Sequence, residues 1–297
     1  MSVAPGKPVV AVVRSEGHYE GTREALSLLE DRIVDSIRGK RRVLVKPNFV
    51  STLRQLAATH VDSVRAVLDT VSECYHGRIV LGEGPAIGSL DDGISNFGYG
   101  ELEDEYGVDV VDLNQDDYLE LEGVDSRLEP LKLRVSRAVL DSDYLISVAK
   151  PKTHDCVVVT LSIKNVVVGA LVGKKEKDKI HQGTKAINVN IAKLAEKCMP
   201  NLAVIDGYVG MEGAGPVSGD PVRLGVSAAS LHPVSLDSVM AKIMGFEPSD
   251  IGYLHYLDEW GVGEADIDGI EVIGESPDDV RRRFKPHPGY ADQLKWR

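Results

Sequence analysis

Cysteine is scarce in this sequence. The 297 residues include three cysteines, Cys74, Cys156 and Cys198, at wide spacings and without any C-x-x-C pair. The chain therefore encodes no zinc ribbon and no ferredoxin-type cluster motif, and a disulfide framework is not expected. Because free thiols are typical of reducing compartments, we expect a cytoplasmic protein.

Aromatic and basic residues are also in short supply. Aromatic residues make up 5% of the chain, and 34 basic against 46 acidic residues give a formal net charge of −12. Base-stacking surfaces need aromatic side chains, and polyanion-binding surfaces need a basic excess. These deficits argue against nucleic acid and anionic membranes as main partners.

Long apolar runs are missing as well. The apolar run near the N-terminus is too short for a signal peptide and is closed by Arg14. No stretch approaches the roughly 20 apolar residues of a membrane helix. We therefore expect no membrane segment, and the oligomeric state is left open.

Short β-branched runs alternate with amphipathic segments along the chain. The runs are apolar on both faces, as in buried parallel strands. We expect strands over residues 9–13, 43–45, 78–81, 108–113, 144–148, 202–205, 225–229 and 270–273, and helices over 22–37, 61–74, 187–198 and 235–244. Thr59 and Asp62 form a predicted capping box for the second helix. The pattern predicts an α/β fold with mostly parallel sheets covered by helices.

The domain organisation has two interpretations. We expect one continuous domain over residues 1–297. The acidic stretch 116–129 lies between two α/β halves, so possible lobes are 1–140 and 141–297, with a cleft between them. The alternative is that this stretch is a surface excursion within one domain.

Polar residues follow several predicted strands where each strand ends. Lys46 and Asn48 follow one strand, Glu83 a second, Lys152 and His154 a third, and Asp206 a fourth. In open α/β sheets, ligands bind outside the carboxyl ends of the strands. We therefore expect these side chains to converge on one site.

Residues 150–185 carry eight lysines and three acids, a local balance of +5 in an acidic chain. A positive island of this kind attracts anionic ligands. Lys164 lies inside an apolar run, where burial lowers the pKa of a lysine and prepares it for chemistry. The run Lys174, Lys175, Lys177 and Lys179 is interpreted as a solvated loop.

His154 and His181 flank this unusual lysine. Histidine is the usual acid or base near neutral pH and the commonest metal ligand. Cys156 is interpreted as a small buried hydrophobe. Glu212, in a glycine-rich stretch after a strand, is a candidate base or metal ligand, and Asp237 is either a capping carboxylate or a site residue.

A set of motifs resembles the domain of unknown function numbered 362. The motifs are K-P-N at 46–48, T-H at 59–60, K-P-K-T-H at 150–154, T-L-S-I-K-N at 160–165, M-E-G-x-G-P at 211–216 and S-L-D-S-V-x-A-K-I-M-G-F at 235–246. The resemblance runs from about Val9 to Gly274. Many members carry an added ferredoxin-like segment with close cysteines, which this chain lacks.

The same region more faintly resembles nickel-dependent lactate racemase and its relatives. There a histidine stands ten positions before a lysine and a second histidine follows it, as His154, Lys164 and His181 do here. That resemblance implies two lobes with a cleft, a lysine that anchors a nickel-pincer nucleotide, and histidines that transfer protons and bind metal. The glycine-rich stretch around the racemase lysine is replaced here by residues 160–163.

We therefore expect an enzyme, isomerase-like or oxidoreductase-like, that acts on a small carboxylate or phosphate by proton or hydride transfer. The alternative is a non-catalytic protein of an iron–sulfur or redox pathway that binds a metal, nucleotide or metabolite. A divalent metal and a nucleotide-derived group are the cofactors left open. The predicted site residues are His154, Lys164 and His181 for catalysis, Lys46, Asn48, Lys152 and Asn165 for ligand binding, and His181, Glu212 and Asp206 for metal.

Overall fold

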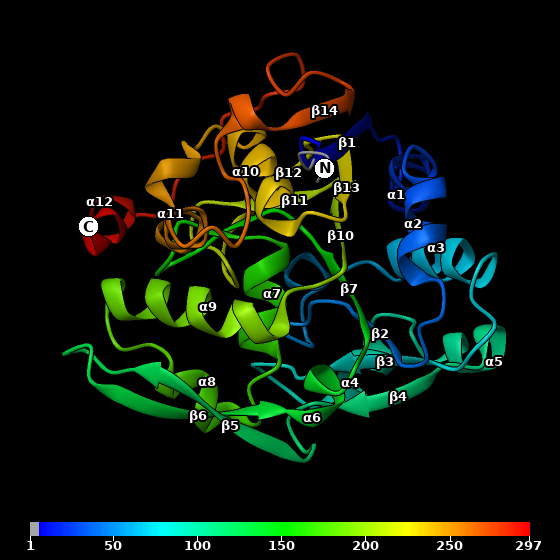
Figure 1. Ribbon diagram of the computed structural model, residues 1–297, viewed down its shortest axis with the longest axis horizontal. Coiled ribbons are helices and arrows are strands. Elements are labelled where there is room, and N and C mark those ends of the chain that lie inside the picture. The colour runs from blue at the N-terminus through cyan, green and yellow to red at the C-terminus, as the bar shows by residue number, and fades with distance from the viewer. Residues whose placement is uncertain (1–5) are drawn as a thin grey trace, which may run out of the picture.

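The computed structural model describes residues 6–297, and an eight-stranded sheet forms its centre (Figure 1). The strand order is β14-β1-β13-β10-β7-β2-β3-β4. The bounds are β1 (Val9–Arg14), β2 (Val43–Lys46), β3 (Ile79–Glu83), β4 (Asp109–Asp112), β7 (Tyr144–Ala149), β10 (Leu202–Gly207), β13 (Val226–Ser230) and β14 (Glu271–Gly274). Only β13 runs antiparallel to its neighbours β1 and β10, and the other pairs are parallel. The predicted α/β class is confirmed, and each predicted strand is a strand of this sheet.

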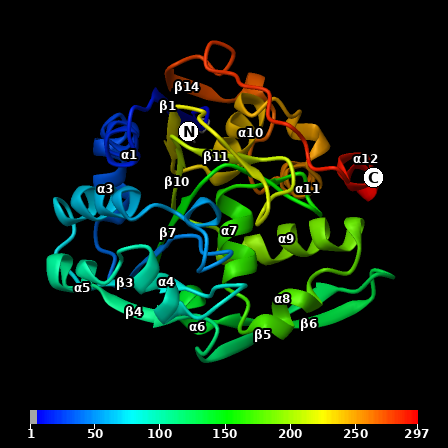
Figure 2. The same ribbon diagram turned by 180° about the vertical axis from the view of Figure 1, so that it is seen from behind.

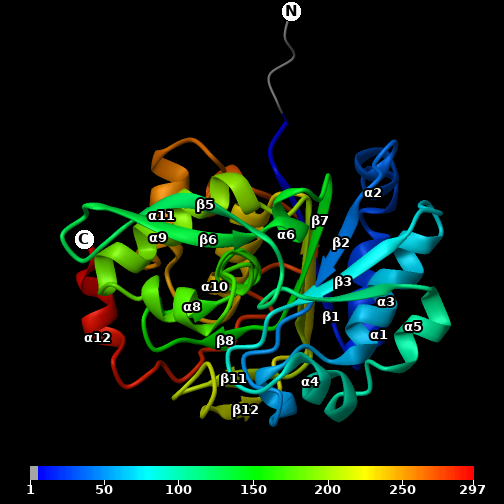
Figure 3. The same ribbon diagram turned by 90° about the horizontal axis from the view of Figure 1, so that it is seen from below.

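Helices cover both faces of the sheet (Figure 3). In β1, Val9 and Ala11 pack into one core and Val10 and Val12 into another, as alternation along a strand requires. On the first face lie α1 (His18–Ser27), α2 (Glu30–Ile37) and α3 (Val61–Ser72). On the second lie α7 (Ser162–Gly169), α9 (Thr184–Cys198), α10 (Pro233–Ile243) and α11 (Gly252–Glu259).

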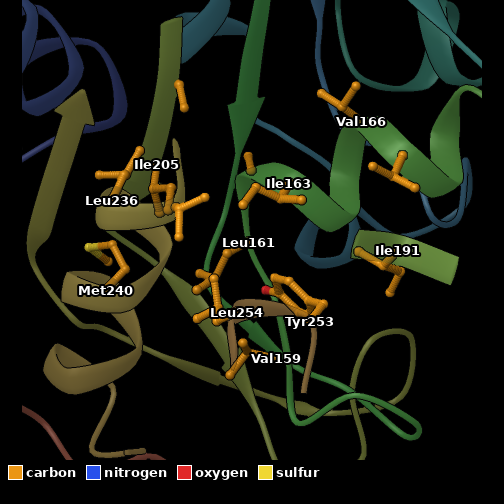
Figure 4. Close-up of a cluster of buried hydrophobic side chains, with 14 of the residues drawn as sticks. Val159, Leu161, Ile163, Val166, Ile191, Ile205, Leu236, Met240, Tyr253 and Leu254 are labelled. Carbon is orange, nitrogen blue, oxygen red and sulfur yellow. The ribbon is translucent and has the colours of Figure 1, made fainter. Parts of the chain in front are cut away.

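Helix α7 is deeply enclosed on the second face. Figure 4 shows Ile163 and Val166 of this helix among apolar side chains of α9, β10 and α10. Both residues are fully buried. Burying side chains of this size contributes about 1.5–3 kcal/mol each, so the position of α7 is firmly set.

The acidic stretch that we interpreted as a lobe boundary forms a hairpin of β5 (Tyr118–Val124) and β6 (Pro130–Ser136). The hairpin runs along α9 at the edge of the molecule (Figure 2). Asn190 of α9 fixes it by bonding the backbone N and O of Val124, at 2.6 and 2.9 Å. Strands from both sides of residue 140 share the large sheet, because β2 pairs with β7 and β1 lies between β13 and β14. The boundary therefore does not divide that sheet, and a division into lobes stays a prediction.

A second, small sheet lies across one end of the large one (Figure 3). Its order is β12-β11-β8-β9. The bounds are β8 (Lys152–Thr153), β9 (Val159–Thr160), β11 (Gly210–Glu212) and β12 (Asp220–Val222). Strands β8 and β11 directly follow β7 and β10, so this sheet covers the carboxyl ends of two large-sheet strands.

Two local predictions at helix ends are wrong. The single helix expected over 22–37 is interrupted between α1 and α2, where Leu29 is the N-cap of the second helix. Thr59 does not cap α3: the N-cap is His60, whose ring accepts from the backbone N of Asp62 at 3.3 Å. Thr59 Oγ1 instead donates to Val148 O at 2.7 Å, fastening this loop to β7.

The shorter helices complete the structure. They are α4 (Leu90–Asn96), α5 (Glu101–Tyr106), α6 (Arg137–Leu140), α8 (Lys174–Lys179) and α12 (Tyr290–Gln293). Helix α4 begins with a capping box between Ser89 and Asp92. Among residues 6–297, no helix is both long enough and apolar enough to cross a membrane.

Candidate functional site

A cavity of about 200 Å³, which we call the Lys164 cavity, lies where α7 meets the segments that follow β2, β3 and β7. Polar side chains line much of it. They are Asn48, Glu83, His154, Asp155, Thr160, Lys164, Asn165, Lys177, Asp178 and His181. The structure thus brings together five residues that the sequence predicted for catalysis or ligand binding: His154, Lys164, His181, Asn48 and Asn165.

Lys164 lies in the first turn of α7 and is 7% exposed. Within residues 6–297, its ammonium group makes no hydrogen bond and no ion pair. Burial lowers the pKa of Lys164 to about 8. The lysine therefore changes charge close to neutral pH, as a group that binds an anion or handles a proton should.

The buried carboxylate of Asp237, from α10, holds the start of α7 in place. Its Oδ1 accepts from Ser162 N at 2.9 Å and Ser162 Oγ at 2.5 Å, and its Oδ2 accepts from Ile163 N at 3.0 Å. The first N–H groups of a helix have no partner within the helix, so these bonds replace a local cap. Asp237 is therefore the capping carboxylate of the two alternatives, and it positions Lys164 without touching the cavity.

A network of buried side chains supports the floor of the cavity. Lys46 Nζ donates to Glu83 Oε2 at 2.6 Å and to Asn165 Oδ1 at 3.2 Å. Asn48 Nδ2 donates to the same Asn165 oxygen at 3.0 Å, and Lys152 Nζ donates to Asn48 Oδ1. The four predicted ligand-binding residues thus form one chain of hydrogen bonds. In this chain, Asn165 of α7 is bonded by both Lys46 and Asn48.

Lys46 needs a glycine beside it. A Cβ at position 169, on the last turn of α7, would lie 2.3 Å from both Cε and Nζ of Lys46. No real Cβ contact is that short. Gly169 therefore provides the space in which Lys46 reaches Glu83.

The two histidines have opposite tautomers when neutral. His154 Nδ1 accepts the backbone N–H of Cys156 at 2.9 Å, so its proton is on Nε2. His181 Nδ1 lies 2.6 Å from the carbonyl O of Lys177 and must carry the proton, so its Nε2 keeps a lone pair. Burial, and then the charge of Lys164, lowers the pKa of His154 to about 3 and also lowers that of His181. At neutral pH one ring offers a donor and the other an acceptor.

His154 Nδ1 also lies 3.0 Å from Asp155 Oδ1. With a pKa of about 3 this imidazole is uncharged near neutral pH, so the contact is not an ion pair there. Asp155 is 53% exposed and stands at the mouth of the cavity. Cys156 is half-buried, and burial raises the pKa of its thiol to about 12. Its interpretation as a small unreactive side chain is consistent with that pKa.

Two side chains of the cavity were missed. Lys177, expected in a solvated loop, is 5% exposed and donates to Leu171 O at 2.6 Å, and burial lowers its pKa to about 8. Thr160 Oγ1 is buried at the cavity wall and has no hydrogen-bond partner in the described chain. A lysine in a charge run and a threonine in a strand carry no sequence signal for a site, whereas Glu83, which follows a predicted strand, was expected there and does line the cavity.

The residues predicted to bind a metal do not come together. Asp206 is fully buried and bonds His18 and Ser63, while Glu212 accepts from the backbone N of Lys285 at 2.9 Å. Neither lines the cavity with His181. Between residues 6 and 297, one group of at least three metal-binding side chains has its ligand atoms within 4.8 Å of one another: His154, Asp155 and Cys156. Asp206 lies against α3 and Glu212 in the small sheet, so the structure does not bring this set together, and a metal site stays a prediction.

Fold and cavity together define an α/β protein with a lysine-rich site at the carboxyl ends of its central strands. Residues 43–242 match the family described as "Domain of unknown function (DUF362)". The chain belongs to this family, and the predicted resemblance is confirmed. A relative, the thylakoid-associated protein sll1697 of Synechocystis sp., is 30% identical over 251 residues, which cover 82% of this chain and 76% of the relative.

The fold is also similar to that of a solved structure, the lactate racemase apoprotein from Thermoanaerobacterium thermosaccharolyticum. The TM-score is 0.52 at 14% sequence identity, over 79% of this chain and 57% of the racemase chain. The chain thus spans little more than half of that protein. At this identity the similarity concerns the fold.

Proposed function

We propose that the chain is an enzyme that acts on a small carboxylate by transferring a proton at the adjacent carbon. One observation carries the proposal: four lysines around the cavity, Lys46, Lys152, Lys164 and Lys177, are at most 7% exposed, and Glu83 is the one buried carboxylate among them. Buried charges need counter-charges. An anionic substrate supplies those that the cavity lacks.

The two histidines have different roles in the proposed reaction because their tautomers differ. His181, with its bare Nε2, is the base that removes the proton. The electron pair of the broken C–H bond then spreads over the carboxylate as an enediolate, stabilised by the Lys164 ammonium and by the Nε2–H of His154. A neutral imidazole with a depressed pKa is suited to donate such a hydrogen bond. The N–H proton of the His181 imidazolium then exchanges with water, and transfer of the solvent-derived proton to the carbon completes the exchange.

The size of the cavity limits what it accepts. At about 200 Å³ the cavity is smaller than the roughly 300–1,000 Å³ typical of sites for drug-sized ligands, so a small acid matches it better. The predicted metal set does not converge, and no metal or nucleotide-derived cofactor has a step in the proposed reaction. Proton transfer also needs no redox partner, unlike hydride transfer.

Solvent exchange tests the proposal directly. Protein purified anaerobically from its own host is incubated in D₂O with glycolate, lactate or malate, and loss of the C2–H signal is followed by proton NMR. We expect exchange with at least one acid, and a fall of about 10²–10⁴-fold in His181→Gln. Lys132→Met, which removes a lysine that is 78% exposed, is the matched control for Lys164→Met.

An absence of exchange with all three acids, or the same rate in His181→Gln, would overturn the enzymatic proposal. Binding of an acid without exchange would instead support the alternative, a non-catalytic metabolite-binding protein. A cytoplasmic location is likewise a proposal, which rests on cysteine usage and is to be weighed against the thylakoid association in the name of the relative.

A further inference from the structure

A second polar cluster lies on the α1–α3 face of the sheet, separate from the Lys164 cavity. At its centre is Asp206, which ends β10 and is fully buried. Its carboxylate accepts from His18 Nδ1 at 2.6 Å, from Ser63 Oγ at 2.6 Å and from Tyr208 N at 3.1 Å. Because Nδ1 of His18 directs its proton toward Asp206, Nε2 of the same ring takes no part in that hydrogen bond.

Two helices begin at this cluster. His18 is the first residue of α1, which has ten residues, and His60 is the N-cap of α3, which has twelve. Their rings stack at 4.1 Å with an interplanar angle of 5°. The start of a helix presents free N–H groups and a positive dipole end, which favour an anion.

Lys150 supplies an independent observation. It follows β7 and is 2% exposed, yet its ammonium group has no hydrogen bond and no ion pair in the described part of the chain. Burial lowers its pKa, and the charge of Asp206 opposes that effect only in part. The oxygens of Asp206 are already occupied by three other donors. Lys150 therefore has Asp206 as a nearby counter-charge but forms no direct ion pair or hydrogen bond within the described residues.

The charge of Lys150 affects the pKa values of neighbouring groups. Burial and the adjacent His18, then Lys150, lower the pKa of His60, while Asp62 and Asp206 raise it. Burial, and then the charges of Lys150 and Lys164, lowers the pKa of Lys152 well below its usual value. The strand register gives the position of Lys150: Ala149, the last residue of β7, pairs with Ile205, so Lys150 follows β7 beside Asp206 of β10.

We propose that Lys150, His18 and His60 form a second anion-binding site, which takes a phosphate or carboxylate group. The imidazoles are the entrance, because the side chains of His18 and His60 are 17% and 30% exposed. The anion accepts from the Lys150 ammonium, which bonds no residue of the described chain, and from the helix N-termini. The site stands on its own residues and does not depend on the proposed reaction.

Inorganic phosphate is the probe for the test. The chain has eight histidines, so their ring signals can be followed individually in ¹⁵N-labelled protein, with His18 and His60 assigned from their Gln variants. We expect phosphate to shift both rings saturably and to raise the pKa of His60, since an added negative charge favours the imidazolium. Lys150→Met should weaken this response about tenfold or more.

Matched variants show whether the loss of phosphate binding is specific to the charge of Lys150. Lys132→Met and Lys164→Met should leave the response of His18 intact, and Lys150→Arg should retain it by keeping the charge. If Lys150→Met does not fold, Lys150→Arg and His60→Gln decide, since the first should bind phosphate and the second should bind it more weakly.

Three results would overturn the second site: no shift at His18 and His60, an undiminished shift in Lys150→Met, or a shift confined to His154 and His181. The last would leave the proposed acid–base reaction untouched. Loss of the His18 response in Lys164→Met would show that one ligand spans the Lys164 cavity and the Lys150 cluster. That result would contradict two separate sites. Conversely, a phosphate site at Lys150 survives even if no acid exchanges its C2 proton.

Discussion

Asp237 binds both the backbone N and the hydroxyl of Ser162, at 2.9 and 2.5 Å, and so ties α10 to the first turn of α7. These bonds join residues that are 75 positions apart in the chain. Lys164 is two residues further along α7 and inherits its place from them. Lys164 is therefore positioned by Asp237, a residue that lies outside the cavity.

Removing that carboxylate should destabilise the protein. Asp237→Ala leaves three buried donors of Ser162 and Ile163 without an acceptor, so we expect a loss on the order of 3 kcal/mol in the free energy of unfolding. Asp237→Asn keeps one acceptor oxygen and should lose less. Denaturant unfolding measures both losses. Asp35→Ala, at a position whose side chain is 71% exposed, should change stability little, and an equal loss there would contradict this role.

Lys164→Met should make the protein more stable while it abolishes ligand binding. The pKa of Lys164 falls from 10.5 to about 8 on folding, so the unfolded chain binds more protons between these values. Stability should therefore rise from about pH 8 to pH 10.5 in the wild type, by on the order of 3 kcal/mol. The variant lacks this contribution and should be more stable at pH 7. A wild type that is as stable at pH 8 as at pH 10.5 would show that Lys164 is solvated.

Gly169→Ala should disturb Lys46. The new Cβ would lie 2.3 Å from the lysine ammonium, which must leave Glu83 or push α7 outward. We expect a loss of about 1–3 kcal/mol and weaker ligand binding. Gly100→Ala is the matched control, because the nearest atom to its Cβ would be 3.9 Å away. Thermal unfolding of both variants makes the comparison, and equal midpoints would contradict the tight packing of Lys46.

The pH profile of C2–H exchange should be bell-shaped. His181 must be neutral to accept a proton, and burial lowers its pKa below 6.5, so the acid limb should lie below that pH. Lys164 must be charged, which places the alkaline limb near pH 8. Lys164→Arg should move the alkaline limb upward, because arginine does not lose its proton in this range. An alkaline limb that stays near pH 8 in this variant would assign it to another group, such as Lys177.

Intact mass spectrometry tests whether Lys164 carries a covalent group. Because the cavity, at about 200 Å³, matches a small acid better than a nucleotide, we expect the mass of the unmodified chain under denaturing conditions. Protein purified anaerobically from its own host is the sample, with native spectra and elemental analysis in parallel. An added mass that survives denaturation and maps to Lys164 would mean that the cavity opens, and would make a tethered cofactor the leading interpretation.

The sequence predicted the large sheet well and its surroundings less well. Runs such as 43–45 and 202–205 are apolar on both faces, a pattern that survives in the structure because both faces are covered. The antiparallel direction of β13 leaves no trace in its own residues, since Ala228 and Ala229 are buried whichever way the strand runs. Strands of two or three residues, such as β8 and β9, are too short to show a period.

The candidate site was likewise predicted only in part from the sequence. Lys164 and His154 could be found because a charge within an apolar run and a histidine after a strand are local signals. The burial of Lys177 and the cap from Asp237 depend on contacts between distant segments, which no local pattern encodes. For the same reason Asp206 and His181 look alike in sequence, as polar residues beside apolar elements, yet lie in different clusters.

The position of β1 has a consequence for how the protein is made. This strand, residues 9–14, has β13 and β14 as its two hydrogen-bonded neighbours, and both come from the last third of the chain. During translation the first strand therefore leaves the ribosome with neither neighbour yet synthesised. A nascent chain that stops before β13 exposes an unpaired apolar strand, which is prone to aggregation. The large sheet therefore cannot be completed before residues 226–274 have been synthesised.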